Sequence, residues 1–306
     1  MVRTSVPFAE ALAAGPVVLD GGLSHQLEAA GHDLGDALWS ARLLAEDPEA
    51  VTEAHRVYFA AGAQVAITAS YQATFAGFAR RGIGAAEAGA LLGRSVALAR
   101  EAAGRARADG VAGPLYVAAS AGPYGAMLAD GSEYRGRYGL TVAELTRFHR
   151  PRLEVLAAAG PDVLALETVP DADEARALVR AVRGLDTPAW LSYSVAGACT
   201  RAGQPLEEAF AVAADVDEIV AVGVNCCAPA DTDHAVEVAA RVTGKPVVVY
   251  PNSGESWDAG ARTWCGAPEF RVEQVTGWAA AGARLIGGCC RVGPEQIRAL
   301  AAQLRG

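Results

Sequence analysis

The chain has 306 residues, of which 52% are hydrophobic and 20% charged, and its formal net charge at pH 7 is −9. A chain of this length can bury a large core without the support of disulfides. The acidic balance and the absence of a basic run argue against nucleic acid and anionic membranes as partners.

We expect neither a signal peptide at the N-terminus nor a transmembrane helix. The N-terminus lacks the apolar segment of a signal peptide, and no stretch approaches the about 18 uninterrupted apolar residues of a transmembrane helix. We therefore expect a cytoplasmic protein, in which thiols stay reduced. The six cysteines are then expected to bind metal, take part in catalysis or fill the core rather than pair.

Eight apolar runs of strand length follow one another along the chain, with helical stretches between them. Each run is nearly continuous in apolar residues and ends in polar or small ones, which is typical of strands buried on both faces of a parallel sheet. The runs cover residues 16–20, 64–70, 114–120, 162–168, 189–195, 218–225, 246–252 and 283–288.

Four of the intervening stretches carry clear helix signals. The first has Asp47 as its expected N-cap and Pro48 in its first turn. The second opens on Thr141 and Glu144, the spacing of a capping box, and contains Pro151, which predicts a kink or a break. The four stretches cover residues 46–63, 141–160, 171–184 and 293–306.

Eight strand–helix units in about 300 residues predict an α/β protein with a (β/α)8 TIM barrel. The pattern also leaves open a doubly wound open sheet, although no G-x-G-x-x-G follows the first strand, which weakens its dinucleotide-binding version. The longest stretches without periodicity, 121–140 and 253–270, both follow strands. In a barrel, both would lie at the catalytic end.

Residues that directly follow the strands of such a barrel build its active site. The first strand ends carry acids, glycines and hydroxyls, and the sixth and eighth carry thiols. In chain order these residues are Asp20, Gly21, Gly22, Thr68, Ser70, Tyr71, Ser120, Tyr124, Glu167, Thr168, Tyr193, Asn225, Cys226, Cys227, Tyr250, Asn252, Glu255, Gly288, Cys289 and Cys290.

Two pairs of adjacent cysteines, at 226–227 and 289–290, stand at strand ends. Adjacent cysteines rarely bridge each other, because the ring is strained, and no C-x-x-C indicates a zinc ribbon or a thioredoxin-like site. Three thiolates around one zinc would leave a fourth position open for a substrate thiol, held as a reactive thiolate. Burial as small hydrophobes is an equal alternative for the pairs on spacing alone, and is the favoured interpretation of Cys199 and Cys265.

Nearly the whole sequence resembles the homocysteine S-methyltransferase family. “GVNC” and “GGCC” are similar to the zinc signature of that family, and “LDGGLSHQLEAAG” to its opening strand and glycine turn. Further segments are most similar to the branch that uses S-methylmethionine as methyl donor: “ITASYQATFAGF”, “SAGPYGAMLADGSEYRGRYG”, “ALETVP”, “WLSYSV” and “VYPNSGE”.

This resemblance implies that residues 1–306 form a single homocysteine-binding barrel domain that holds Zn²⁺. It implies an enzyme that transfers a methyl group from S-methylmethionine, or a related sulfonium such as S-adenosylmethionine, to the thiol of L-homocysteine and so forms methionine. The zinc ligands that it implies are Cys226, Cys289 and Cys290, with Cys227 outside the ligand set. The homocysteine-binding residues that it implies are Asp20, Gly21, Thr68, Glu167 and Asn225.

The chemistry of homocysteine agrees with these positions. Its ammonium group could pair with Glu167 or with the carbonyl of Asp20, and its carboxylate could accept N–H groups from the turn at 21–22. Thr68 and Ser70 could add hydroxyl donors, although ordinary strand-end hydrogen bonding explains them equally well. Asp20 and Glu167 could alternatively cap nearby helices.

The residues that would bind the methyl donor are harder to identify from the sequence. A sulfonium cation favours aromatic faces and carbonyl oxygens, and each candidate is individually explained as well by loop packing. Because charge vanishes during transfer, closing loops that exclude water would help, and the two long loops 121–140 and 253–270 are candidates. The candidate donor contacts are Tyr71, Tyr124, Tyr134, Trp264 and Glu133.

Two other functions stay open on the residues alone. A zinc hydrolase would need histidine or carboxylate ligands, and the five histidines form no H-x-H or H-x-x-x-H pair. A non-catalytic metal or redox sensor could also use adjacent cysteines. The sequence leaves a monomer and a dimer equally open.

Overall fold

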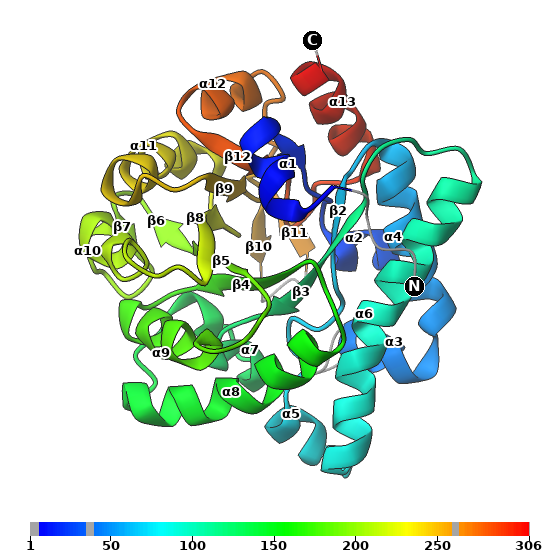
Figure 1. Ribbon diagram of the computed structural model, residues 1–306, viewed down its shortest axis with the longest axis vertical. Coiled ribbons are helices and arrows are strands. Elements are labelled where there is room, and N and C mark those ends of the chain that lie inside the picture. Colours follow the sequence, from blue (N-terminus) through cyan, green and yellow to red (C-terminus); the bar gives the residue numbers. More distant parts are fainter. Residues whose placement is uncertain (1–5, 35–39, 259–262, 306) are drawn as a thin grey trace.

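Eight parallel strands form the central sheet of the computed structural model, which describes residues 6–34, 40–258 and 263–305. Their order is β1-β12-β9-β8-β5-β4-β3-β2, and a parallel bridge between Leu19 and Val65 joins the two ends (Figure 1). The sheet is therefore a barrel, which confirms the predicted (β/α)8 fold and excludes the open sheet. The strands are β1 (Val17–Val18), β2 (Val65–Ile67), β3 (Tyr116–Ala121), β4 (Val163–Val169), β5 (Ala189–Tyr193), β8 (Ile219–Asn225), β9 (Val247–Tyr250) and β12 (Ala283–Ile286).

Helices surround this barrel and bury one apolar face against it (Figure 1). The principal ones are α4 (Pro48–Ala61), α6 (Ala85–Ala108), α8 (Val142–Ala158), α9 (Ala172–Val182), α10 (Leu206–Ala211), α11 (Thr232–Thr243), α12 (Gln274–Ala280) and α13 (Pro294–Arg305). The shorter ones are α1 (Phe8–Ala14), α2 (Leu23–Ala29), α3 (Ser40–Glu46), α5 (Phe75–Ala79), α7 (Tyr124–Leu128), η1 (Ser132–Tyr134) and η2 (Pro229–Asp231). No helix among the described residues is long and apolar enough to cross a membrane.

Helix termini follow the predicted capping chemistry. The side chain of Asp47 accepts the N–H of Ala50 at the start of α4, and Thr141 and Glu144 form the expected capping box at the start of α8. Of the predicted kink or break at Pro151, the break is wrong, because α8 continues through this residue. The proline removes one hydrogen bond of the helix, and the packing of α8 between α6 and α9 outweighs that loss.

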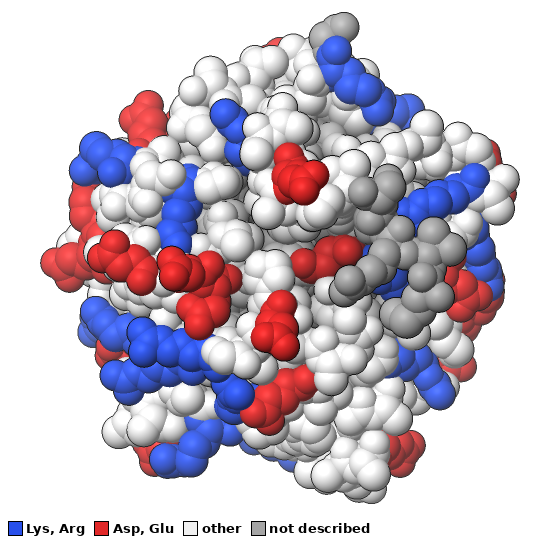
Figure 2. Space-filling view, viewed as in Figure 1, with Lys and Arg blue, Asp and Glu red and all other residues white. Residues whose placement is uncertain are grey.

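The N-terminal helix α1 closes one end of the barrel. Phe8 and Leu12 pack into the cluster of side chains inside the barrel, and the Phe8 ring meets Tyr116 edge-on with centroids 5.3 Å apart. Figure 1 looks onto this end, with α1 over the barrel centre. On the same face, Lys and Arg side chains lie among Asp and Glu side chains (Figure 2). The opposite end, where the strands have their carboxyl termini, is left for the site.

Two short antiparallel hairpins lie at the carboxyl end of the barrel. The pair β6 (Val195–Ala196) and β7 (Cys199–Thr200) follows β5. The pair β10 (Ser256–Asp258) and β11 (Thr263–Cys265) follows β9 and lies in the second predicted loop. The first predicted loop contains α7 and η1.

Candidate active site

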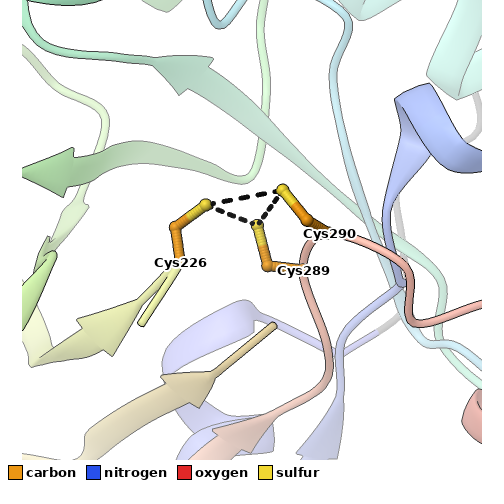
Figure 3. Close-up of side chains that lie close together, drawn as sticks. All are labelled: Cys226, Cys289 and Cys290. Atoms are coloured by element: carbon orange, nitrogen blue, oxygen red, sulfur yellow. Dashed lines mark hydrogen bonds between the residues drawn. The ribbon is translucent and has the colours of Figure 1, made fainter. Parts of the chain in front are cut away.

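Three cysteine side chains converge at the carboxyl end of the barrel. Cys226 ends β8, whereas Cys289 and Cys290 follow β12, and their sulfur atoms point toward one another (Figure 3). The Sγ atom of Cys226 lies 3.3 Å from that of Cys289 and 3.7 Å from that of Cys290, and the last two are 4.0 Å apart. The structure thus brings together the three residues expected to bind metal.

These separations fit one tetrahedral metal ion. Zinc–thiolate bonds of about 2.3 Å at tetrahedral angles place two sulfurs about 3.8 Å apart. Hydrogen bonds from Cys226 and Cys289 lower the pKa of the Cys290 thiol well below its ordinary value, so that thiol ionises first. Cys227 lies outside the group and is fully buried in the apolar layer between barrel and helices, as expected for a residue that fills the core.

The Cys226 side of the cysteine cluster is bonded to β9, which lies between β8 and β12 in the sheet. The N–H of Cys226 donates to the carbonyl of Tyr250 at 3.2 Å. One residue further on, the N–H of Asn252 donates to the carbonyl of Cys227 at 3.0 Å. The segment after β9 therefore fixes the backbone on both sides of the Cys226 side chain.

The same segment holds the other two cysteines. Cys289 donates its N–H to the carbonyl of Pro251 at 2.7 Å, and the carbonyl of Cys290 accepts the N–H of Ser253 at 2.9 Å. The N–H of Cys290 donates to the side-chain oxygen of Asn252 at 3.2 Å. Residues 250–253 thus brace both cysteine segments, and the cluster is organised by protein hydrogen bonds.

Left-handed backbone marks two of the strand ends at the site. Thr168 has φ +58° and Cys226 has φ +51°, a conformation that non-glycine residues adopt only when their surroundings enforce it. At Thr168, Asn225 is the enforcing group: its Oδ1 accepts the Thr168 N–H at 2.7 Å and its Nδ2 donates to Thr168 Oγ1 at 2.8 Å. Asn225 Oδ1 also accepts the Ser192 hydroxyl at 2.8 Å.

Two buried acids face the same region from β1 and β4. Asp20 Oδ2 accepts the N–H of Ile67 at 2.8 Å, and Glu167 accepts the hydroxyl groups of Ser120 and, at 2.9 Å, Tyr250. Burial raises the pKa of Glu167 to about 7. Burial also raises the pKa of Asp20 well above its ordinary value, and the charge of Glu167 adds to that shift. An ammonium group between the two carboxylates would relieve both effects.

The turn after β1 packs directly on the turn after β12. A Cβ atom on Gly21 would lie 2.2 Å from the carbonyl oxygen of Val292, so only glycine fits there. The N–H of Gly22 donates to that same carbonyl at 3.0 Å, and the Asp20 carbonyl accepts the N–H of Gly288 at 3.2 Å. Of the N–H groups in the turn at 21–22 that were expected to meet the carboxylate of homocysteine, that of Gly22 is thus bonded within the protein in this structure.

The hydroxyl groups after β2 bond to β3. Thr68 Oγ1 lies 2.7 Å from Ser70 Oγ, the Ser70 hydroxyl donates to the carbonyl of Ser120 at 2.7 Å, and Thr68 Oγ1 accepts the N–H of Ser120 at 3.0 Å. In this structure both side chains join neighbouring strand ends. They contribute to the site by fixing Ser120, which in turn binds Glu167.

The candidate donor contacts differ in where the structure places them. Tyr134 lies in the site, with its hydroxyl 3.1 Å from Cys226 Sγ. Tyr124 packs instead against the rings of Tyr138 and Phe148, with centroids 5.2 and 4.8 Å away, as expected of a loop-packing residue. The side chain of Trp264 lies outside the described part of the chain.

Sequence reasoning gave no role to Ser120 and Tyr250, the two hydroxyl partners of Glu167. Their position at strand ends was the available signal. It also missed a buried network behind the loop after β3, for which the sequence holds no signal: Arg152 donates to His149 Nδ1 at 2.7 Å and to the Gly122 carbonyl, and His149 Nε2 lies 2.9 Å from Glu174.

Comparisons with known proteins agree with this site. A family model described as homocysteine S-methyltransferase matches residues 17–304. The homocysteine S-methyltransferase of Escherichia coli is 47% identical over 293 residues, with 94% of each chain covered, and homocysteine S-methyltransferase 1 of Arabidopsis thaliana is 44% identical, with 95% of this chain and 94% of the relative covered.

A solved structure gives the same result in three dimensions. The crystal structure of the homocysteine methyltransferase MmuM from Escherichia coli in its metallated form superposes with a TM-score of 0.86 at 46% identity, covering 94% of this chain and 96% of that one. The matches to these methyltransferases cover nearly the whole of both chains, which argues against the hydrolase and sensor alternatives.

Proposed function

The chain belongs to the homocysteine S-methyltransferase family, and from that membership we propose that it transfers a methyl group from S-methylmethionine, or a related sulfonium such as S-adenosylmethionine, to the thiol of L-homocysteine, forming methionine. It is a methyltransferase that acts on a thiol. The observation that carries the proposal is the convergence of three cysteine sulfurs within 4.8 Å of one another.

Zn²⁺ is the metal that we propose for Cys226, Cys289 and Cys290. Three soft thiolates in tetrahedral spacing suit zinc, and a metallated structure of a relative supports a metal here. Zinc bound there would hold the homocysteine thiol as a thiolate near neutral pH and so make it a nucleophile. The braced backbone of residues 250–253 keeps the three sulfur atoms in place for this task.

The amino-acid end of homocysteine is assigned to the two buried acids. Asp20 and Glu167 come from strands on different sides of the barrel mouth, and a substrate ammonium group would pair with them once they are ionised. Gly21 keeps the first turn close to the cysteine turn, and Asn225 fixes Thr168 and thereby the neighbouring Glu167. Thr68 and Ser70 act through Ser120.

Methyl transfer itself is a displacement in line between two sulfur atoms. A lone pair of the homocysteine thiolate forms the new S–CH₃ bond while the bond from that carbon to the sulfonium sulfur breaks and its electron pair stays with the departing sulfur. A cation and an anion become two neutral thioethers, so a site that excludes water favours the reaction. The loop that carries Tyr134 lies against Cys226 and is suited to exclude water from the site.

The proposal extends to the setting of the enzyme. We infer that residues 1–306 act as one homocysteine-binding barrel, with small-molecule substrates as partners. The cytoplasm is the proposed compartment, because the cluster requires reduced thiols.

A donor panel tests the proposed function. Zinc-loaded protein is incubated with homocysteine and either S-methylmethionine, S-adenosylmethionine or betaine, and methionine is measured. We expect methionine with a sulfonium donor and little with betaine. One zinc per chain without methionine from either sulfonium would refute the proposal.

A further inference from the structure

A buried acid, one of the candidate donor contacts, lies beside the cysteine cluster. Glu133 belongs to η1, in the loop after β3, and only 4% of it is exposed. Its Oε2 atom is buried and has no hydrogen-bond partner among the described residues. A buried carboxylate oxygen without a partner is costly, and native proteins retain one where a ligand completes it.

The neighbours of Glu133 face the reacting sulfur atoms. Tyr134, the next residue, places its hydroxyl 3.1 Å from Cys226 Sγ. Tyr71 lies against the same space, since the charges of Cys226 and Glu133 both act on its hydroxyl. Tyr71 is held there by the loop itself, because a Cβ atom on Gly122 would lie 2.5 Å from the Tyr71 ring.

The charged groups that act most strongly on Glu133 are not cations, although the guanidinium of Arg201 lies over the neighbouring Tyr134 ring, 5.5 Å from its centre. After burial, the groups that act on its carboxylate include the thiol of Cys226 and the carboxylate of Asp130, and both oppose its charge. Three thiolates and one Zn²⁺ carry a net charge of −1, so the region between Glu133 and Cys226 would remain negative with the metal bound. A cationic ligand with a low hydration cost would be attracted to it. The rings of Tyr71 and Tyr134 offer aromatic surface to such a cation, with Arg201 covering one face of Tyr134.

We propose that Glu133, together with the rings of Tyr71 and Tyr134, forms the wall of the methyl-donor subsite that selects a sulfonium over a neutral thioether. This inference rests on the proposed function, because it assigns the donor of that reaction. The ammonium of homocysteine is the less suitable occupant, since Asp20 and Glu167 already supply two acids for it at β1 and β4.

The kinetic role follows from the charge change. The carboxylate stabilises the cation before transfer, and the positive charge disappears as the methyl group moves. The contact therefore contributes to donor binding and not to the chemical step. After transfer the donor is a neutral thioether that Glu133 no longer attracts, which favours its release.

Equilibrium binding tests the inference without turnover. The zinc-loaded protein is titrated calorimetrically with S-methylmethionine and with methionine, which differ in the sulfonium methyl group and share the ammonium and carboxylate. We expect wild-type protein to bind the sulfonium more tightly, and Glu133→Gln to weaken sulfonium binding about tenfold or more while methionine binding changes less than about twofold. Glu133→Asp should keep part of the preference.

A matched control separates the local contact from the general field of the loop. Asp130 is an exposed acid in the same loop, and Asp130→Asn removes one negative charge while keeping an acceptor for Ser132. This variant should keep the full preference for the sulfonium. Zinc content and thermal unfolding of each variant verify that the fold is retained.

Three results would overturn the inference: no preference in wild-type protein, an undiminished preference in Glu133→Gln, or equal weakening of both ligands. Steady-state kinetics of Glu133→Gln should show a raised KM for the donor, an unchanged KM for homocysteine and an undiminished kcat. Failure of the proposed function would appear differently, as binding of the sulfonium without any methionine formed in the donor panel.

Discussion

Replacing Asn225 by alanine tests how the end of β4 is held. The substitution removes three hydrogen bonds, two to Thr168 and one from Ser192, in a region with no exposed polar atoms. It leaves the buried Thr168 N–H without a partner, and three such bonds at about 1 kcal/mol each, with part of that desolvation, give a loss of roughly 3 to 4 kcal/mol in the free energy of unfolding.

The functional effect should follow from the backbone. Thr168 is a β-branched residue at φ +58°, a strain on the order of 1 kcal/mol that Asn225 maintains. Its release returns part of the loss and leaves a net loss of about 2 to 3 kcal/mol in the free energy of unfolding. Once released, Thr168 would shift Glu167 away from Ser120 and Tyr250. We therefore expect Asn225→Ala to raise the KM for homocysteine about tenfold, a loss near 1.4 kcal/mol, while one zinc per chain is retained.

Urea unfolding and steady-state kinetics measure the two effects together. Ser192→Ala is the control, because it leaves both bonds to Thr168 while removing the bond to Asn225 and the 3.0 Å contact of Ser192 Oγ with the Tyr250 hydroxyl. It should cost about 1 kcal/mol and leave the homocysteine KM within about twofold. An Asn225→Ala variant with unchanged stability but a raised KM would refute the reasoning, since Asn225 would then act on the substrate directly.

Three further predictions concern the metal, pH and helix α8. Cys289→Ser should abolish zinc retention and methionine formation, whereas Cys227→Ala should retain one zinc per chain, and loss of metal from the second variant would contradict the ligand set. Because burial raises the pKa of Glu167 from 4.5 to about 7, folded protein keeps its proton where the unfolded chain loses it, so the free energy of unfolding should fall as pH rises through this window. Glu167→Gln should reduce that fall in urea titrations at pH 5 and 8, and an unchanged slope would assign it to other acids. Thr141→Ala should lower the free energy of unfolding by about 1 kcal/mol without changing kcat/KM, and no loss of stability would mean that the capping box is dispensable.

The fold could be predicted because buried parallel strands read as short apolar runs. Each of the eight predicted runs coincides with one strand of the barrel, and only β3 and β4 extend beyond their runs, by one residue each. Several strands end earlier than predicted: β2 ends at Ile67 and β9 at Tyr250, where runs 64–70 and 246–252 continue. The extra residues leave the ladder to build the site, so the polar residues that signalled function also ended the regular structure.

The site was predictable only where side-chain identity determines its chemistry. Adjacent cysteines at two strand ends indicated a metal site. The sequence does not show which backbone N–H groups are bonded within the protein, as that of Gly22 is. The network of Arg152, His149 and Glu174 lies on α8 and α9, where polar residues at helical spacing usually face solvent. Their burial depends on how the helices pack behind the loop after β3.

The position of the cysteines in the sheet has a consequence for how the chain folds. Cys226 is made 63 residues before Cys289, and β12 is the strand that pairs with both β9 and β1. The last strand to be synthesised, β12, therefore pairs with the first, β1. The same step brings Cys289 and Cys290 beside Cys226. Completion of the barrel and completion of the metal site are one event, so a nascent or truncated chain that lacks β12 has neither.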